Sequence, residues 1–155
     1  MIVLAVRSDL RFGLSYRDVE ELLAEPFIKG RELTVAVMGG EPLAVTELKP
    51  KAGFYDYDAK YTDGLTQHVC PAQVPVEIAS SMMDMAARSH QLLGCKGASR
   101  SDFRWDDELG EAGIYLLEVN TQPGMTPLSL VPEQAKLNGV SYGELVERLI
   151  EEALT

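Results

Sequence analysis

Cysteine, aromatic and basic residues are scarce in this sequence. Two cysteines among 155 residues cannot build the framework of a disulfide-rich secreted protein, and so low a number suits a reducing compartment. Lysine and arginine total 14 against 24 acidic residues, for a formal net charge of −10. Because a nucleic-acid surface requires clustered Lys and Arg, the composition argues against a nucleic-acid partner, although it is compatible with a locally basic pocket.

Long apolar runs are also missing. The apolar segment Met1–Val6 is too short to span a bilayer and lacks the cationic start and the cleavage site of a signal peptide. We therefore expect a strand there, a cytoplasmic protein and no membrane partner. A short helix over Tyr16–Ala24, with Ser15 as its N-cap, is expected next. No glycine-rich phosphate loop precedes Glu25, so the informative patterns begin at that residue.

Alternating apolar residues predict the strands of an α+β fold. Residues Glu32–Met38 alternate, Gly39 and Gly40 allow a tight turn with positive φ, and Pro42–Glu47 returns, which together predict a β-hairpin. Two further strands are expected at residues 99–103 and 114–120. The turn between these later strands is acidic, and we expect it to be solvated rather than to bind a ligand; its acidic residues are Asp106, Asp107 and Glu108.

Helical spacing predicts two helices. Apolar residues recur across Glu77–Leu93, and Gly94 follows at the position that commonly ends a helix. The buried stripe is expected to contain Ile78, Met82, Met85 and Leu92. Ser141 and Glu144 form a capping box that begins a final helix, which is expected to pack through Leu145, Leu149 and Ile150. The two histidines, His68 and His90, are expected to be surface or hydrogen-bonded residues rather than ligands.

The most informative stretch runs from Tyr115 to Pro132, where an apolar strand carries two oxygen-bearing side chains and then breaks into a Pro-Gly loop. Side chains alternate faces along a strand. Glu118 and Asn120 therefore point the same way, while Leu117 and Val119 are expected to point into the opposite layer.

A second pair of polar side chains follows the same spacing. Arg100 and Asp102 share one face of another short strand. If the two strands are neighbours, Asp102, Glu118 and Asn120 converge on one point beside a guanidinium, and their oxygens are the ligands that Mg²⁺ prefers. A hydrogen-bonded strand end explains the spacing about equally well, so the local pattern alone leaves both interpretations open.

The sequence resembles the D-alanine–D-alanine ligases, which are members of the ATP-grasp superfamily. The resembling segments are residues 25–37, 54–61, 94–103, 117–126 and 129–132, and their order and spacing agree from about Glu25 to the C-terminus. The resemblance implies the C-terminal domain of the ATP-grasp fold, a mainly antiparallel sheet packed against helices. It also implies the substrates ATP and D-alanine, and Mg²⁺ or Mn²⁺ with two ions per site.

The resemblance implies roles for residues along the chain. Glu25 and the backbone of Pro26 and Ile28 would contact adenine, and Glu32 would bind the ribose. Residues 54–61 would form a loop that closes over the site, with Lys60 near the transferred phosphate and Tyr61 locking the closed loop. Asp102, Glu118 and Asn120 would hold magnesium, and Arg100 with the backbone N–H of Gly124 would face the oxyanion. The positions implied for the second D-alanine are Ser129 and Leu130.

Length limits how much of such a ligase the chain can contain, because 155 residues make about one domain. We expect residues 1–24 to be a truncated or atypical remnant of the central domain and residues 25–155 to be the C-terminal catalytic domain. Two other functions stay open, another carboxylate–amine ATP-grasp ligase and a non-catalytic Mg–nucleotide-binding remnant. A homodimer of the full-length form, an N-terminal half supplied in trans, and D-serine or D-lactate as second substrate also stay open.

Overall fold

The computed structural model describes residues 2–3, 24–25, 27–50 and 66–154. A five-stranded antiparallel sheet in the order β5-β4-β3-β6-β7 forms its centre, with helices on both faces, which confirms the α+β prediction. The elements are β1 (Ile2–Val3), β2 (Ala24–Glu25), β3 (Arg31–Met38), β4 (Glu41–Pro50), β5 (Thr66–Val69), α3 (Val76–Leu92), β6 (Ala98–Trp105), the 3-10 helix η2 (Asp107–Gly113), β7 (Ile114–Asn120), α4 (Leu130–Leu137) and α5 (Tyr142–Ala153).

The predicted hairpin is formed by β3 and β4. Gly39 and Gly40 connect the strands with φ values of 57° and 84°, a backbone region that is open to glycine at little steric cost. The pairing shifts register between Val35 and Val37. A short strand pair, β1 with β2, lies apart from the main sheet. It confirms a strand at Ile2–Val3, and Ala24 is a strand residue rather than the helix end expected from sequence.

One face of the sheet packs against α3. The buried residues here are Leu33, Val35, Val37, Val45, Ile78, Met82, Ala86, Phe103 and Trp105. Gly94 ends α3 with φ 62°, as predicted. The prediction for Leu92 was wrong, since this side chain is 82% exposed. The buried positions of α3 end at His90, and two more residues rotate the helix by about 200°, which turns Leu92 to solvent.

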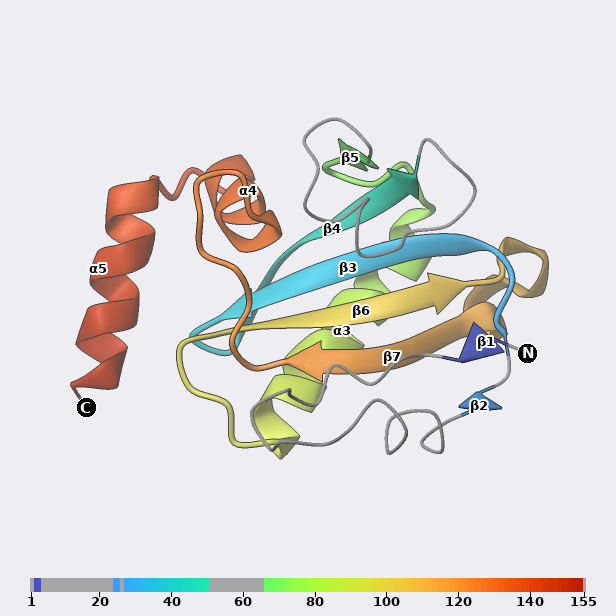
Figure 1. Ribbon diagram of the computed structural model, residues 1–155, viewed down its shortest axis with the longest axis horizontal. Coiled ribbons are helices and arrows are strands. Elements are labelled where there is room, and N and C mark those ends of the chain that lie inside the picture. Colours follow the sequence, from blue (N-terminus) through green and yellow to red (C-terminus); the bar gives the residue numbers. More distant parts are fainter. Residues whose placement is uncertain (1, 4–23, 26, 51–65, 155) are drawn as a thin grey trace.

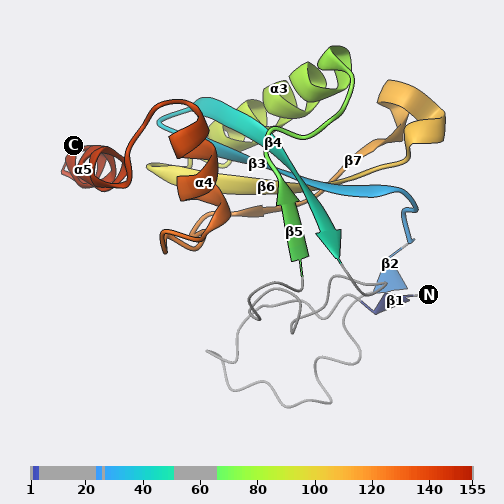
Figure 2. The same cartoon turned by 90° about the horizontal axis from the view of Figure 1, so that it is seen from above.

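The opposite face of the sheet is covered at one end by α4 and α5, as Figure 2 shows from above. Its buried residues are Ala36, Met38, Ala98, Val131, Ala135, Val140 and Leu145. The capping box of Ser141 and Glu144 is present. Leu145 and Leu149 join this cluster, but Ile150 is largely exposed, so that part of the prediction was wrong. Ile150 lies about 100° around the helix from Leu149.

The acidic turn also differs from the expectation. It folds into η2, and Asp106 is 6% exposed, with its carboxylate accepting a hydrogen bond from the Glu108 N–H. The Trp105 indole N–H donates to the Gly110 carbonyl at 2.8 Å, which closes the turn. Asp106 is therefore a structural cap, whereas Asp107 and Glu108 are exposed as expected. In the described part of the chain no helix has the length and apolar character needed to cross a membrane.

Candidate active site

Alternation along β3 and β6 places a row of polar side chains on the face that α4 and α5 cover only at one end. The antiparallel register pairs Thr34 with Asp102 and Glu32 with Arg104. These positions share one face because each lies two residues from the next along its strand. The polar row therefore continues from the residues that α4 and α5 cover, and Thr34 at its start is fully buried.

The last two strands bring the predicted candidate residues together. β6 and β7 are neighbours, and their register pairs Arg100 with Asn120 and Asp102 with Glu118. Directly opposed residues of an antiparallel pair have Cβ atoms about 4.5–5.5 Å apart. The convergence expected from residue spacing is therefore present in the fold, on an edge strand of the sheet (Figure 1).

The register of β7 corrects one detail. Asp102 pairs with Glu118 but Phe103 pairs with Leu116, which leaves Leu117 as an extra residue in a β-bulge. Leu117 is 40% exposed, and Leu116 packs against the core in its place. The prediction that Leu117 points into the opposite layer was wrong, because a bulge inserts one residue and breaks strict alternation.

Two residues, Arg100 and Thr34, donate hydrogen bonds to the Asp102 carboxylate. The guanidinium of Arg100 donates Nε–H to Oδ1 at 2.8 Å and Nη2–H to Oδ2 at 2.7 Å. The Thr34 hydroxyl also donates to Oδ1, at 2.7 Å. Arg100 is only 6% exposed, so the structure buries this charge. The bidentate pair compensates that burial.

The donor set suits a hard cation. Asp102 and Glu118 contribute carboxylates from opposed positions, and Asn120 contributes an amide whose Oδ1 accepts from the Gln122 N–H at 3.0 Å. Among the described residues no three His, Cys, Asp or Glu side chains gather in a metal-binding group. The set becomes three oxygen donors only when the amide is counted. Mg²⁺ commonly takes one or two carboxylates and leaves the remaining positions to water and phosphate, so these residues fit such an ion.

The segment that precedes β3 carries the candidate nucleotide residues. The carbonyl of Ile28 accepts a hydrogen bond from Arg104 Nε at 3.0 Å, and Glu32 Oε2 lies 3.4 Å from Arg104 Nη1. The backbone of Glu25 pairs with Ile2 in the small sheet. The side chain of Glu25 and the residues Pro26, Lys60 and Tyr61, together with the expected loop 54–61, lie outside the described residues.

The Pro-Gly loop after β7 is closely packed. A Cβ added at Gly124 would lie 3.0 Å from Ser129 Oγ, so the glycine permits this approach. Ser129 Oγ also accepts from the Thr126 N–H at 3.0 Å. Leu130, the first residue of α4, is 7% exposed, which leaves its backbone rather than its side chain to contact a substrate.

Two features of this region were not anticipated. Gln134 of α4 is fully buried; its Oε1 accepts from the Ala36 N–H at 2.8 Å and its Nε2 donates to the Thr34 carbonyl at 3.3 Å. It therefore satisfies the backbone of β3 where the register shifts, next to the residue that bonds Asp102. A polar residue in a short apolar helix is a weak sequence signal, and its partners are about 100 positions away.

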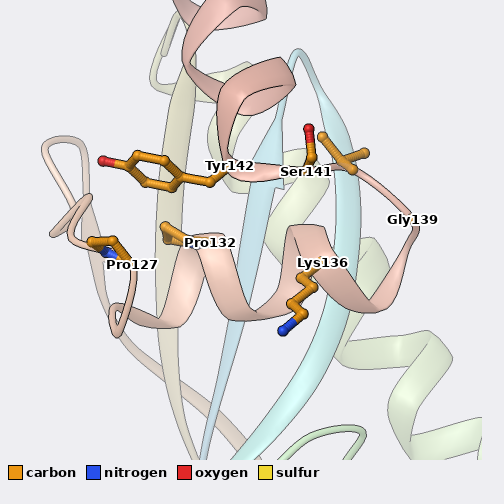
Figure 3. Close-up of a pocket in the computed structure, with 7 residues that line it drawn as sticks. Pro127, Pro132, Lys136, Gly139, Ser141 and Tyr142 are labelled. Atoms are coloured by element: carbon orange, nitrogen blue, oxygen red, sulfur yellow. The ribbon is translucent and has the colours of Figure 1, made fainter.

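The second feature is the junction of α4 and α5. The Tyr142 hydroxyl donates to the Met125 carbonyl at 2.7 Å, which ties the Pro-Gly loop to the start of α5. A hollow of about 470 Å³ lies beside this contact and is lined by Pro127, Pro132, Lys136, Gly139, Val140, Ser141 and Tyr142. Figure 3 shows Tyr142 extending toward the loop that carries Pro127. None of the candidate metal or nucleotide residues lines this hollow.

Comparison with known proteins gives consistent matches. The model of the family described as D-ala D-ala ligase C-terminus matches residues 12–151. The D-alanine–D-alanine ligase of Sphingopyxis alaskensis is 67% identical over 99% of this chain and 52% of the relative, and that of Rhizorhabdus wittichii is 71% identical over 86% and 43%. The chain thus spans about half the length of these curated relatives. A crystal structure of D-alanine–D-alanine ligase from Bacillus anthracis complexed with ATP is similar with a TM-score of 0.68, at 33% identity over 84% of this chain and 41% of that chain.

Proposed function

Because this chain belongs to the D-alanine–D-alanine ligase family, we propose that it forms the C-terminal part of an active site for ATP-dependent joining of two D-alanines in peptidoglycan precursor synthesis. The observation that carries the proposal is the cross-strand cluster of Arg100, Asp102, Glu118 and Asn120 on β6 and β7. We further propose that residues 25–155 are the catalytic domain and residues 1–24 a remnant of the central domain.

The proposed reaction has two steps. A carboxylate oxygen of the first D-alanine attacks the γ-phosphorus of ATP, and the bond between this phosphorus and the β,γ-bridging oxygen breaks. ADP is the leaving group and an acyl phosphate is formed. The amine of the second D-alanine then attacks the acyl carbon. The bond between this carbon and the phosphate oxygen breaks, phosphate leaves with the electron pair, and the amine loses a proton. Both steps develop negative charge, so preorganised donors contribute most where that charge appears.

The nucleotide would lie along the segment before β3. Glu25 and the backbone of Pro26 and Ile28 would contact adenine, and the Glu32 carboxylate would accept hydrogen bonds from the ribose hydroxyls. Lys60 would approach the transferred phosphate, and Tyr61 would lock the loop that carries it. Ile28 and Glu32 adjoin the carboxylate cluster through Arg104, which pairs with Glu32 across the strands.

Asp102, Glu118 and Asn120 would hold Mg²⁺ or Mn²⁺, with two ions per site. When bound, such ions neutralise phosphate charge. Of the three ligands, Asp102 already has its orientation set by Thr34 and Arg100, and Glu118 is opposite it in the register. This preorganisation limits the rearrangement that binding requires.

Arg100 and the backbone N–H of Gly124 would donate to the oxyanion of the tetrahedral intermediate. The planar guanidinium of Arg100 offers donors beyond the two that Asp102 accepts. Ser129 and the Leu130 backbone would orient the second D-alanine at the start of α4. The tie between Tyr142 and Met125 would keep this loop in place against the sheet.

A Mg–nucleotide-binding module without turnover is the second candidate. The chain spans about half of the relatives' length. The first candidate includes a homodimer of the full-length form, or an N-terminal half supplied in trans. The catalytic proposal and this alternative differ in turnover.

The test is D-alanine-dependent phosphate release from ATP with Mg²⁺. We expect the isolated chain to release phosphate near the background rate, because positioning by a complete site supplies nearly all phosphoryl-transfer catalysis. A completed enzyme, made by joining the N-terminal half of the Sphingopyxis alaskensis relative to this chain, should turn over. In that enzyme Glu118→Ala should abolish most activity and weaken Mg²⁺ titration in calorimetry, whereas Glu147→Ala on the exposed side of α5 should change neither. An inactive completed enzyme, or equal rates in both variants, would contradict the proposal.

A further inference from the structure

Arg104 contacts three residues in and just before β3. Its Nε donates to the Ile28 carbonyl at 3.0 Å, and its Nη1 lies 3.4 Å from a carboxylate oxygen of Glu32. The guanidinium carbon is 5.4 Å from the centre of the Phe27 ring, within the range of a cation–π contact. One planar group thus links a backbone carbonyl, a carboxylate and an aromatic ring.

These contacts are more than a surface ion pair. An exposed pair at 3.4 Å would contribute little, but the Arg104 side chain is only 18% exposed and Glu32 is its direct cross-strand partner. The register fixes both Cα positions, so the guanidinium has little freedom to leave Glu32. The bond to Ile28 fixes the guanidinium from a second direction, so the planar fork presents Nη1 to the Glu32 carboxylate from a restrained position.

We propose that Arg104 is a positioning and specificity-determining residue for the nucleotide, in that it orients the Glu32 carboxylate toward the ribose hydroxyls and the Ile28 backbone toward the base. The inference rests on the proposed function, since it assigns work within the same nucleotide site. Neither the spacing of the sequence motifs nor the resemblance pointed to this residue.

The chemistry of the two partners explains the expected specificity. The Ile28 carbonyl already accepts from Arg104, so its N–H is the backbone group that we assign to an acceptor nitrogen of adenine. Glu32, ionised beside the guanidinium, accepts hydrogen bonds and therefore selects sugars that carry hydroxyl donors. Loss of Arg104 should consequently reduce the preference for nucleotides that carry ribose hydroxyls more than it reduces the rate of the chemical step.

The experiment compares ATP with 2′,3′-dideoxy-ATP in the completed enzyme. Wild type should show a KM for ATP at least about tenfold lower than for the dideoxy nucleotide, which lacks both ribose hydroxyls, since one charge-assisted hydrogen bond already accounts for about that factor. Arg104→Met keeps the bulk but removes the donors, and it should raise the KM for ATP about tenfold with kcat within about a factor of two. The KM ratio between the two nucleotides should fall to about two. Arg104→Lys should recover part of the ratio, because it restores the charge without the fork.

The controls separate this role from general stability. Arg88→Met, an exposed position on α3 at the opposite face of the sheet, should leave both KM values unchanged. In a Glu32→Gln background Arg104→Met should not lower the ribose preference further, since coupled residues give non-additive effects. An active wild type whose KM ratio survives Arg104→Met and Arg104→Lys would overturn the inference. A completed wild-type enzyme without D-alanine-dependent turnover would instead overturn the proposed function.

Discussion

The two faces of the sheet each contain a carboxylate held by an arginine with almost the same geometry. On the α3 face Arg31 donates to both oxygens of Glu47 at 2.8 and 2.7 Å. On the opposite face Arg100 donates to both oxygens of Asp102 at 2.8 and 2.7 Å. The same bidentate unit therefore occurs twice, and its surroundings must account for any difference in role.

The surroundings of the two pairs differ. Arg31 lies over the Trp105 ring, with 5.3 Å to its centre, and donates to the Gln73 carbonyl at 2.9 Å. Burial alone would raise the pKa of the Glu47 carboxyl, yet the bonds from Arg31 and the charge of Lys49 lower it below its usual value. Both Arg31 and Glu47 thus have further partners within the protein, Trp105 and Gln73 for the arginine and Lys49 for the carboxylate. We therefore assign this pair a structural role.

The Arg100 pair faces polar groups instead of an aromatic cover. Asn120 and Glu118 stand opposite Arg100 and Asp102 on the edge strand, and 19% of the Asp102 side chain is exposed against 6% of the Glu47 side chain. An ion pair at such a place can exchange partners with a substrate. The comparison teaches that the neighbours of an ion pair, more than its own geometry, separate a structural role from a candidate catalytic one.

The largest effect is expected at Arg31. Arg31→Ala leaves the Glu47 carboxylate, which is 4% exposed, without its bidentate partner and with Lys49 at 3.3 Å. Removal of one member of a buried pair costs up to about 3–5 kcal/mol. Urea denaturation of the isolated chain should show this loss of unfolding free energy. At a temperature where the completed variant enzyme stays folded, kcat should be within about a factor of two of wild type. A stable variant that lacks turnover would reverse the assignment of the two faces.

Arg100 should affect turnover far more than Arg31 does, although its burial means that its removal also lowers stability. In the completed enzyme Arg100→Ala should lower kcat by about 10²–10³-fold, as expected for loss of one oxyanion donor, and Arg100→Lys should recover only part of it because an ammonium lacks the planar fork. Since Arg100 is buried, thermal melts of the same proteins are required beside the kinetics. A kcat equal to that of wild type, with a lowered melting temperature, would make Arg100 the structural equivalent of Arg31.

The smallest expected effect is a pH dependence of stability due to His90, a buried residue of α3. His90 is buried, its Nδ1 lies 2.7 Å from Ser99 Oγ, and burial lowers its pKa below the ordinary 6.5 while Glu152 partly opposes the shift. A lowered folded-state pKa means that the unfolded chain binds more protons as pH falls below about 6.5, so stability declines there. Denaturation between pH 7 and 5 should show this decline, and His90→Asn should flatten it. An unchanged slope in that variant would assign the decline to other groups.

Local patterns predicted much of this fold correctly. The Gly39-Gly40 turn, the end of α3 at Gly94 and the capping box of α5 each depend on residues within four positions of one another, and short-range sterics and hydrogen bonds decide them. The errors at Leu92 and Ile150 come from the same source. The apolar stripe of a helix can be predicted from sequence. The point along the stripe at which a neighbouring element ceases to cover it cannot.

The candidate site was predicted only in part for a related reason. Period-two spacing placed Glu118 with Asn120 and Arg100 with Asp102, but the pairing of their strands is a long-range contact. The bulge at Leu117, the bond from Thr34 to Asp102 and the buried amide of Gln134 all depend on partners from other elements. The sequence alone could not reveal these contacts, because no local rule relates residues about 70 to 100 positions apart.

The sequence by itself determined the residue types, the alternation that assigns each to a face, and the turns and caps that bound the elements, since these depend on neighbours along the chain. Only the tertiary structure decided the surroundings of the two arginine–carboxylate pairs. Arg100 and Asp102 lie two residues apart on one strand, so their spacing predicted a shared face, whereas Arg31 and Glu47 come from two strands and lie 16 positions apart. What separates the pairs in the fold is the Trp105 ring beside Arg31 and the polar groups of β7 opposite Arg100 and Asp102, and packing between distant elements is set by the whole fold.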